Sequence, residues 1–163
     1  MKKTVLMCAL SLMVGVLAWA GQPSSFDVVL QHYEPIRLAL LADSMEGVSK
    51  NGTAIAEELR GLQAESSDQR MGVSGEAAKI VKQQLPAMIT AADSMAKATS
   101  LEPARSAFYD LSKPLVRWRE GVAEGSRPSV AYCPMYKRSW LQPGTEIGNP
   151  YGGMPRCGQI VSN

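Results

Sequence analysis

The sequence predicts an all-α fold: an antiparallel four-helix up-down bundle followed by a loop-rich C-terminal lobe that carries a short β-ribbon. Four long segments contain apolar residues spaced by three or four positions, as on one face of a helix. After residue 127 this periodicity stops, while Gly, Pro and aromatic residues become more frequent. We therefore expect one domain, in which a lobe of residues 128–163 packs on a bundle of residues 21–127.

The first two expected helices span residues 24–42 and 43–64. The first contains Pro35, which removes one backbone donor and predicts a kink. The second begins with the spacing of a capping box at residues 43–46. Gly52 falls on its apolar face, where a missing side chain lets a neighbouring helix approach closely. A polar loop is expected from residue 65 to residue 73.

The third expected helix begins at Ser74, a good N-cap, and contains Pro86, which predicts a kink or two stacked pieces. The fourth begins at Ser100, contains Pro114 and ends near Gly125. Their apolar faces, with those of the first two helices, should form the core. We also expect ion pairs between helices among three charged residues: Asp43, Arg105 and Asp110.

Residues 1–20 have the form of a secretory signal peptide. Lys2 and Lys3 precede an uncharged apolar run, and small residues at Ala18 and Ala20 predict cleavage after Ala20. We expect a periplasmic protein with no membrane span after cleavage. Cleavage removes two of the 17 basic residues and none of the 15 acidic ones, which leaves 15 of each. A neutral chain without clustered Lys and Arg argues against a nucleic-acid partner.

The lobe contains the candidate site. It holds the two cysteines that remain after cleavage, Cys133 and Cys157, and a methionine close to each, Met135 and Met154. Four soft sulfur donors favour a Cu(I) or Ag(I) site with all four residues as ligands. The alternative is a Cys133–Cys157 disulfide, because two nearby thiols usually pair in an oxidising compartment. Spacing leaves both readings open.

The lobe also contains a short predicted ribbon, in which residues 129–133 pair antiparallel with residues 158–161. If the cysteines are paired, the expected function is a disulfide-stapled interaction module that presents Trp140 and Tyr151 to a protein partner. An enzyme is not expected. His32 is the only histidine, it lies far from the sulfur residues in sequence, and no nucleophile is paired with a base.

The C-terminal segment resembles the closing motif of a bacterial family of domains of unknown function, the 3347 family. Helical residues upstream resemble that family at similar spacing, so the resemblance covers essentially the whole chain after the signal peptide. The matching residues are Tyr132 to Met135, Trp140, Leu141, Ile147, Asn149 to Gly152, Met154, Cys157 and Gly158 in the tail, and Leu40 to Asp43, Ala104, Arg105, Phe108, Leu111 and Ser112 in the helices.

The resemblance implies an envelope domain that handles heavy metals. Members of that family occur alone or joined to adaptor subunits of copper and silver efflux pumps, so a metal-efflux adaptor or another envelope protein is the implied partner. The segment from Cys133 to Met135 also resembles the Tyr-His-Cys-Pro-Met segment of small heavy-metal-binding modules. Here Ala131 and Tyr132 replace the Tyr-His pair, which removes a possible histidine ligand.

Overall fold

The structure is a computed structural model that describes residues 22–65 and 67–163. The expected signal peptide, residues 1–20, lies outside the described residues. The prediction of a mostly helical chain with a small β element is confirmed. The elements are α1 (Ser25–Leu41), α2 (Val48–Glu65), α3 (Asp68–Met71), α4 (Gly75–Lys97), α5 (Leu101–Gly121), a 3-10 turn (Glu124–Ser126), β1 (Ser129–Cys133), β2 (Arg138–Gln142) and β3 (Gln159–Ser162).

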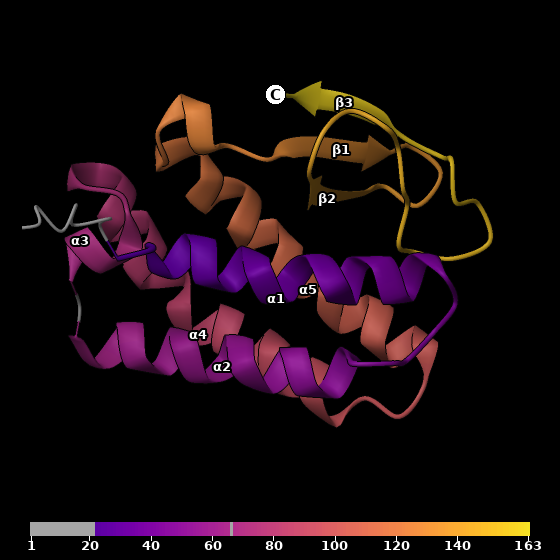
Figure 1. Ribbon diagram of the computed structural model, residues 1–163, viewed down its shortest axis with the longest axis horizontal. Coiled ribbons are helices and arrows are strands. Elements are labelled where there is room, and N and C mark those ends of the chain that lie inside the picture. The colour runs from indigo at the N-terminus through magenta and orange to yellow at the C-terminus, as the bar shows by residue number, and fades with distance from the viewer. Residues whose placement is uncertain (1–21, 66) are drawn as a thin grey trace, which may run out of the picture.

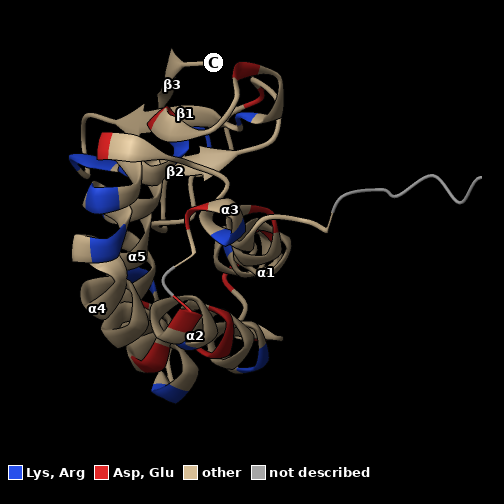
Figure 2. Ribbon diagram, turned by 90° about the vertical axis from the view of Figure 1, so that its left-hand side faces the viewer, with Lys and Arg blue, Asp and Glu red and all other residues tan. Residues whose placement is uncertain are grey.

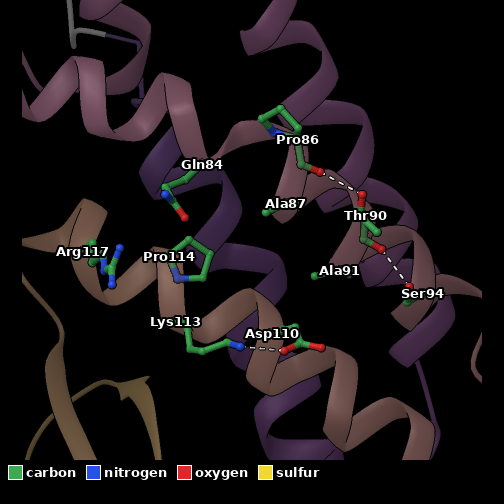
Figure 3. A pocket seen from close by; sticks show the side chains of 10 residues that line it. All are labelled: Gln84, Pro86, Ala87, Thr90, Ala91, Ser94, Asp110, Lys113, Pro114 and Arg117. Carbon is green, nitrogen blue, oxygen red and sulfur yellow. Dashed lines mark hydrogen bonds and ion pairs between the residues drawn. The ribbon is translucent and has the colours of Figure 1, made fainter.

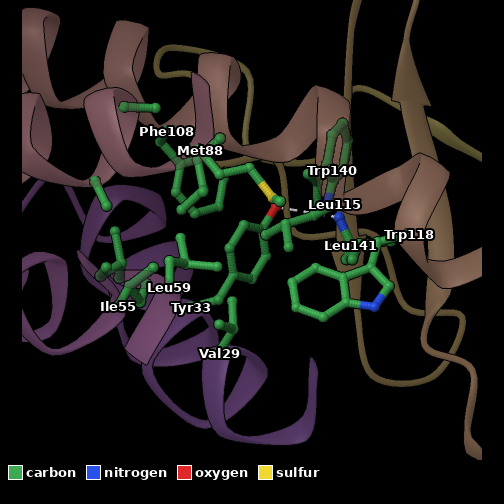
Figure 4. Packing of buried hydrophobic residues seen from close by; sticks show 14 of the residues in the cluster. Val29, Tyr33, Ile55, Leu59, Met88, Phe108, Leu115, Trp118, Trp140 and Leu141 are labelled. Atoms are coloured by element: carbon green, nitrogen blue, oxygen red, sulfur yellow. Dashed lines mark hydrogen bonds between the residues drawn. The ribbon is translucent and has the colours of Figure 1, made fainter. Parts of the chain in front are cut away.

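The four long helices bury their apolar stripes in a single core. α1 packs against α2 and α5, α2 packs against α4, and α4 packs against α5 (Figure 1). Within the described part of the chain, no helix is both long and apolar enough to cross a membrane. The largest fully buried side chains, several of which are drawn in Figure 4, are Trp118, Trp140, Tyr33, Phe26, Phe108, Ile36, Leu40, Ile55, Leu59, Leu62, Met71 and Met88.

The capping box lies at the start of α1 and not at the start of α2. Ser24 Oγ accepts a hydrogen bond from the backbone amide of Asp27, and the Asp27 carboxylate accepts one from the Ser24 amide. The box expected at residues 43–46 is wrong, because α2 begins only at Val48. Asp43 has a φ of 53°, a turn conformation, and its carboxylate pairs with Arg105.

The three prolines expected to kink or divide helices lie inside continuous ones. α1 contains Pro35, α4 contains Pro86 and α5 contains Pro114. The alternative of two stacked pieces at Pro86 is therefore wrong. Each proline removes only one donor from its helix, and the apolar face on either side keeps the helix on the core. The expected polar loop after α2 contains one further turn of helix, α3.

Gly52 is the close-approach position that the sequence predicts. A Cβ added there would lie 2.8 Å from the backbone nitrogen of Ala96 and 3.2 Å from the carbonyl oxygen of Ala92. Both atoms belong to the backbone of α4 and cannot move aside as a side chain can. The packing of α2 on α4 therefore depends on the absence of a side chain at this position.

The lobe contains a three-stranded antiparallel sheet in the order β2-β1-β3. The expected ribbon is confirmed as the β1–β3 pair, with Ala131 opposite Ile160 and Tyr132 opposite Gln159. β2 was not expected from the sequence. It pairs with β1 along its whole length and packs on α5. The sheet lies on one side of the helices (Figures 1 and 2).

Candidate functional site

Cys133 and Cys157 form a disulfide in this structure. Their sulfur atoms are 2.09 Å apart and their Cα atoms are 5.5 Å apart. Cys133 ends β1 and is fully buried, whereas Cys157 is partly buried in the turn that leads into β3. Of the two readings that the sequence left open, the structure contains the disulfide. The bond joins the first strand of the sheet to the segment that enters the last one.

The two methionines of the predicted site are exposed. Met135 lies in the turn between β1 and β2 with 71% of its surface exposed, and Met154 lies in the loop before Cys157 with 37% exposed. The carbonyl of Met154 accepts hydrogen bonds from the Cys157 amide and from the side chain of Asn149. The disulfide and this loop therefore keep both thioethers in one lobe, each within three residues of a cysteine.

The lobe as it stands offers thioethers but no thiolate. A disulfide sulfur carries no negative charge, so the predicted ligand set of two thiolates and two thioethers exists only in the reduced protein. Among residues 22–65 and 67–163 no three side chains from His, Cys, Asp and Glu are grouped so that they could hold a metal ion. A soft metal therefore depends on the methionines and on reduction of the disulfide.

Two buried arginines fix the loop between β2 and β3 to the helices. Arg37 Nη1 of α1 donates to the carbonyl of Gly148 at 2.8 Å, and Arg105 Nε of α5 donates to the carbonyl of Pro150 at 3.0 Å. They are only 6% and 8% exposed. Charge-assisted hydrogen bonds of this kind contribute about 1.5–3 kcal/mol each. Glu34 balances the charge of Arg37, with oxygen to nitrogen distances of 2.6 and 2.7 Å.

Arg105 also explains the ion pairs that were expected between helices. Its Nη2 donates to the carbonyl of Leu40 at 2.9 Å and pairs with the Asp43 carboxylate. The expected contact between Arg105 and Asp43 is confirmed. Asp110 instead pairs with Lys113 on its own helix at 2.9 Å. Arg105 thus joins α5, the end of α1 and the lobe at one point.

Tyr33 connects α1 and α5 to β2. Its hydroxyl lies 2.7 Å from Ser112 Oγ and accepts a hydrogen bond from the backbone amide of Leu141 at 3.2 Å. Burial raises the pKa of Tyr33, because the charged phenolate would be cut off from water. The tyrosine therefore stays neutral at physiological pH and acts as a structural hydrogen-bonding group.

Trp140 and Tyr151 do not face a partner, contrary to the expectation. They are 0% and 4% exposed, and their ring centroids lie 5.9 Å apart with an edge contact. Tyr151 also contacts Phe108, which stacks on Tyr33 at 4.5 Å. Burial raises the pKa of Tyr151, and its hydroxyl donates to the carbonyl of Ser139. Both aromatics therefore attach the lobe to the helices instead of presenting a surface.

Sequence reasoning missed the roles of Arg37 and Tyr33 in positioning the lobe. A signal was present, because Arg37 directly follows Ile36 on the buried stripe of α1, where a charged residue needs a buried partner. Its partner, a loop carbonyl 111 residues away, could not be identified from spacing. His32 is partly buried, and its Nδ1 lies 3.0 Å from Asn51 Oδ1, as suits a structural position.

Comparison with known proteins gives a family without a described function. The model of a family described as "Protein of unknown function (DUF3347)" matches residues 29–126. The match covers most of α1 and all the helices that follow, but it ends before β1, so the tail motif that suggested this family lies outside it. No curated protein and no solved structure matches the chain. Because the match covers more than half of the sequence, the chain belongs to the DUF3347 family of proteins of unknown function.

Proposed function

We propose that this chain is a non-catalytic interaction module of the cell envelope, exported to the periplasm by residues 1–20. The Cys133–Cys157 disulfide is the observation that carries the proposal. Structural disulfides persist in oxidising compartments and are rare in reducing ones. In this proposal the four long helices form an up-down bundle that acts as a rigid scaffold, and the disulfide holds the lobe ready for a partner.

The exposed methionines are the candidate contact residues of the lobe. Met135 and Met154 flank the disulfide, whereas Trp140 and Tyr151 are buried and unavailable. Methionine is flexible and polarisable, so it adapts to varied apolar surfaces. The partner that we propose is an envelope protein, such as the adaptor subunit of a metal-efflux system that the family resemblance implies.

A thiol count tests this proposal. The protein is expressed with its own leader, recovered from the periplasm without reductant, and treated with an alkylating reagent before intact mass measurement. We expect a chain that begins at Gly21 and takes up no reagent. The matched control, residues 21–163 expressed in the reducing cytoplasm, should be alkylated at both cysteines. Two reactive thiols in the periplasmic sample, or a retained leader, would contradict the proposal.

A second candidate function is Cu(I) or Ag(I) binding by the reduced lobe. The exposure of Met135 and Met154, each close to a cysteine, favours it, because a soft metal could reach both thioethers. In the reduced form the ligands would be Cys133, Met135, Met154 and Cys157. The metal would then bind in competition with the disulfide, so one lobe could hold either but not both.

Metal titration distinguishes the two candidates. Reduced protein is mixed with Cu(I) and a weak competing chelator, and retained metal is counted by native mass spectrometry. If the second candidate is correct, the reduced protein retains Cu(I), the oxidised protein does not, and Cys133→Ser abolishes retention. Met135→Leu and Met154→Leu should weaken it, whereas Met45→Leu, a partly buried methionine outside the lobe, should not. No retention by the reduced protein would exclude this function.

A further inference from the structure

A groove of about 600 Å³ lies between α4 and α5, and its lining residues all belong to these two helices (Figure 3). Gln84, Ala87 and Ala91 line it on α4, and Lys113, Pro114 and Arg117 line it on α5. The two helices are in close contact beyond one end of the groove, because a Cβ on Gly121 would lie 2.7 Å from that of Ala77. Between the two alanines and Pro114, the side chains are too short to fill the space.

The two walls of the groove differ in charge. Every α4 residue that lines it is uncharged, whereas α5 contributes Lys113 and Arg117 against the single carboxylate of Asp110. Lys113 Nζ already contacts Asp110 at 2.9 Å, which leaves Arg117 as the uncompensated charge. Arg117 is exposed and makes no ion pair or hydrogen bond with any described residue.

The positive wall continues onto the sheet through Tyr109. Lys113 Nζ lies 4.7 Å from the centre of the Tyr109 ring, and the guanidinium of Arg138 on β2 lies 5.0 Å from it. Both cations therefore contact the same aromatic ring. Arg138 lies outside the groove, so an occupant meets Arg117 and the paired Lys113 on one side and uncharged side chains on the other.

We propose that this groove binds an acidic amphipathic helix of a partner protein. From Gln84 to Ser94 the α4 wall spans eleven residues, and the ten steps between them correspond to about 15 Å, or nearly three helical turns. Ile80, 39% exposed, lies one turn before Gln84 on the same face and extends the apolar line. A helix with small apolar residues toward Ala87 and Ala91 would place carboxylates on its flank beside Lys113 and Arg117.

This inference rests on the proposed interaction function and identifies a partner surface for it. The charge pattern favours a carboxylate-bearing helix over a basic one, because a basic flank would face Arg117 and Lys113 with like charge. A helix also fits the shape better than a bulky side chain alone, because small residues on one wall permit a close backbone approach. The surface is separate from Met135 and Met154, so the two regions can be tested independently.

The test uses a pair of synthetic peptides and the disulfide-bonded protein. One labelled helical 14-mer carries alanine and leucine on one face and glutamate on the flank, and its partner peptide has lysine at every glutamate position. We expect saturable binding of the acidic peptide by fluorescence anisotropy, with the basic peptide at least about tenfold weaker. Amide shifts in NMR spectra should be confined to residues 80–94 and 109–117.

Variants test whether the acidic peptide binds in the groove. Arg117→Glu should weaken the acidic peptide at least about tenfold, and Ala87→Gln, which fills the groove without adding charge, should do the same. Lys50→Glu, the same charge reversal on α2, should leave the affinity within about twofold. All variants are checked for the wild-type circular-dichroism spectrum and melting temperature.

Three results would overturn the inference: equal binding of both peptides, no effect of Arg117→Glu, or shifts that map to another surface. A concentration-dependent dimer that Arg117→Glu dissolves would also overturn it, because the occupant would then be a second copy of the chain. These failures are distinct from a failure of the proposed function. The thiol count and the export test do not depend on the groove, and the peptide test uses protein whose disulfide has already been verified.

Discussion

Removal of the disulfide should release the end of the lobe but leave the rest of the structure in place. The bond closes a loop of about 25 residues, for which chain entropy predicts a contribution of about 3.5 kcal/mol. Within that loop, the segment up to Tyr151 has its own attachments to Arg37, Arg105 and Tyr33. Residues 152–162 have one arginine contact of this kind, from Arg119 to Ser162, and β3 is mostly exposed. The loss should therefore appear mainly in residues 152–162.

Amide hydrogen exchange measures how much stability residues 152–162 lose. If the whole contribution is lost locally, the opening equilibrium of residues 152–162 rises by at most about 300-fold, since 1.4 kcal/mol corresponds to a factor of ten. The β1–β3 pairing and the bond from Arg119 to Ser162 remain, so the measured factor should be smaller. In Cys133→Ala/Cys157→Ala, we expect faster exchange there, unchanged protection at Leu141 and an intact helical circular-dichroism signal at 25 °C.

Wild-type protein under reductant should behave as the double variant does. Met135→Leu, a change in the same lobe that keeps the disulfide, is the control and should exchange as wild type. The reasoning is refuted if the Leu141 amide loses protection together with residues 152–162. It is also refuted if the helical signal disappears cooperatively at 25 °C, because lobe and helices would then not be separable at residue 127.

Three further predictions concern the packing of the helices and β2. Gly52→Ala should lower the free energy of unfolding in urea by about 1–3 kcal/mol, because the added Cβ would meet the α4 backbone. The control is Gly61→Ala on the same helix, where the space around the glycine is open. It should raise the free energy of unfolding by up to about 1 kcal/mol. Tyr33→Phe should cost about 1–3 kcal/mol because the buried Leu141 amide loses its acceptor, and the control Tyr136→Phe should be near neutral. Because the pKa of Tyr33 is raised in the folded protein, the unfolded chain releases the phenol proton at a lower pH than the folded chain does. The free energy of unfolding should therefore fall above about pH 10. The decline in melting temperature from pH 8 to 11 should be shallower in Tyr33→Phe than in wild type.

Helices were predictable because their signal is local. Apolar residues at spacings of three and four identify α1, α2, α4 and α5, and the structure buries those residues in the core. The predicted ends of the helices were less accurate where a residue distant in sequence binds a predicted capping residue. Asp43 and Glu46 have capping-box spacing, but the Asp43 carboxylate pairs with Arg105, 62 residues away, and α2 begins later.

The lobe was less predictable because its conformation depends on contacts with the helices. β2 has no strong alternating pattern, and its amide at Leu141 donates a hydrogen bond to the Tyr33 hydroxyl of α1. Trp140 and Tyr151 look like exposed loop aromatics in the sequence, but both are buried, their rings contact each other, and Tyr151 also packs on Phe108 of α5. The cysteine pairing was foreseen as one of two readings, since cysteine spacing and export favour a disulfide without excluding a metal.

The glycines of the lobe illustrate how sequence signals can have two causes. Gly148 and Gly152 lie in the loop between β2 and β3, where sequence signals predict turns, but a Cβ on Gly148 would lie 2.6 Å from Arg37 Nη1, and one on Gly152 would lie 3.1 Å from Arg105 Nη1. Both arginines need close access to backbone carbonyls of this loop, and a side chain at either glycine would obstruct them. The loop therefore owes its position to two guanidinium groups that bind its backbone. Because those contacts do not use the methionine side chains, the lobe is attached to the helices while Met135 and Met154 stay exposed.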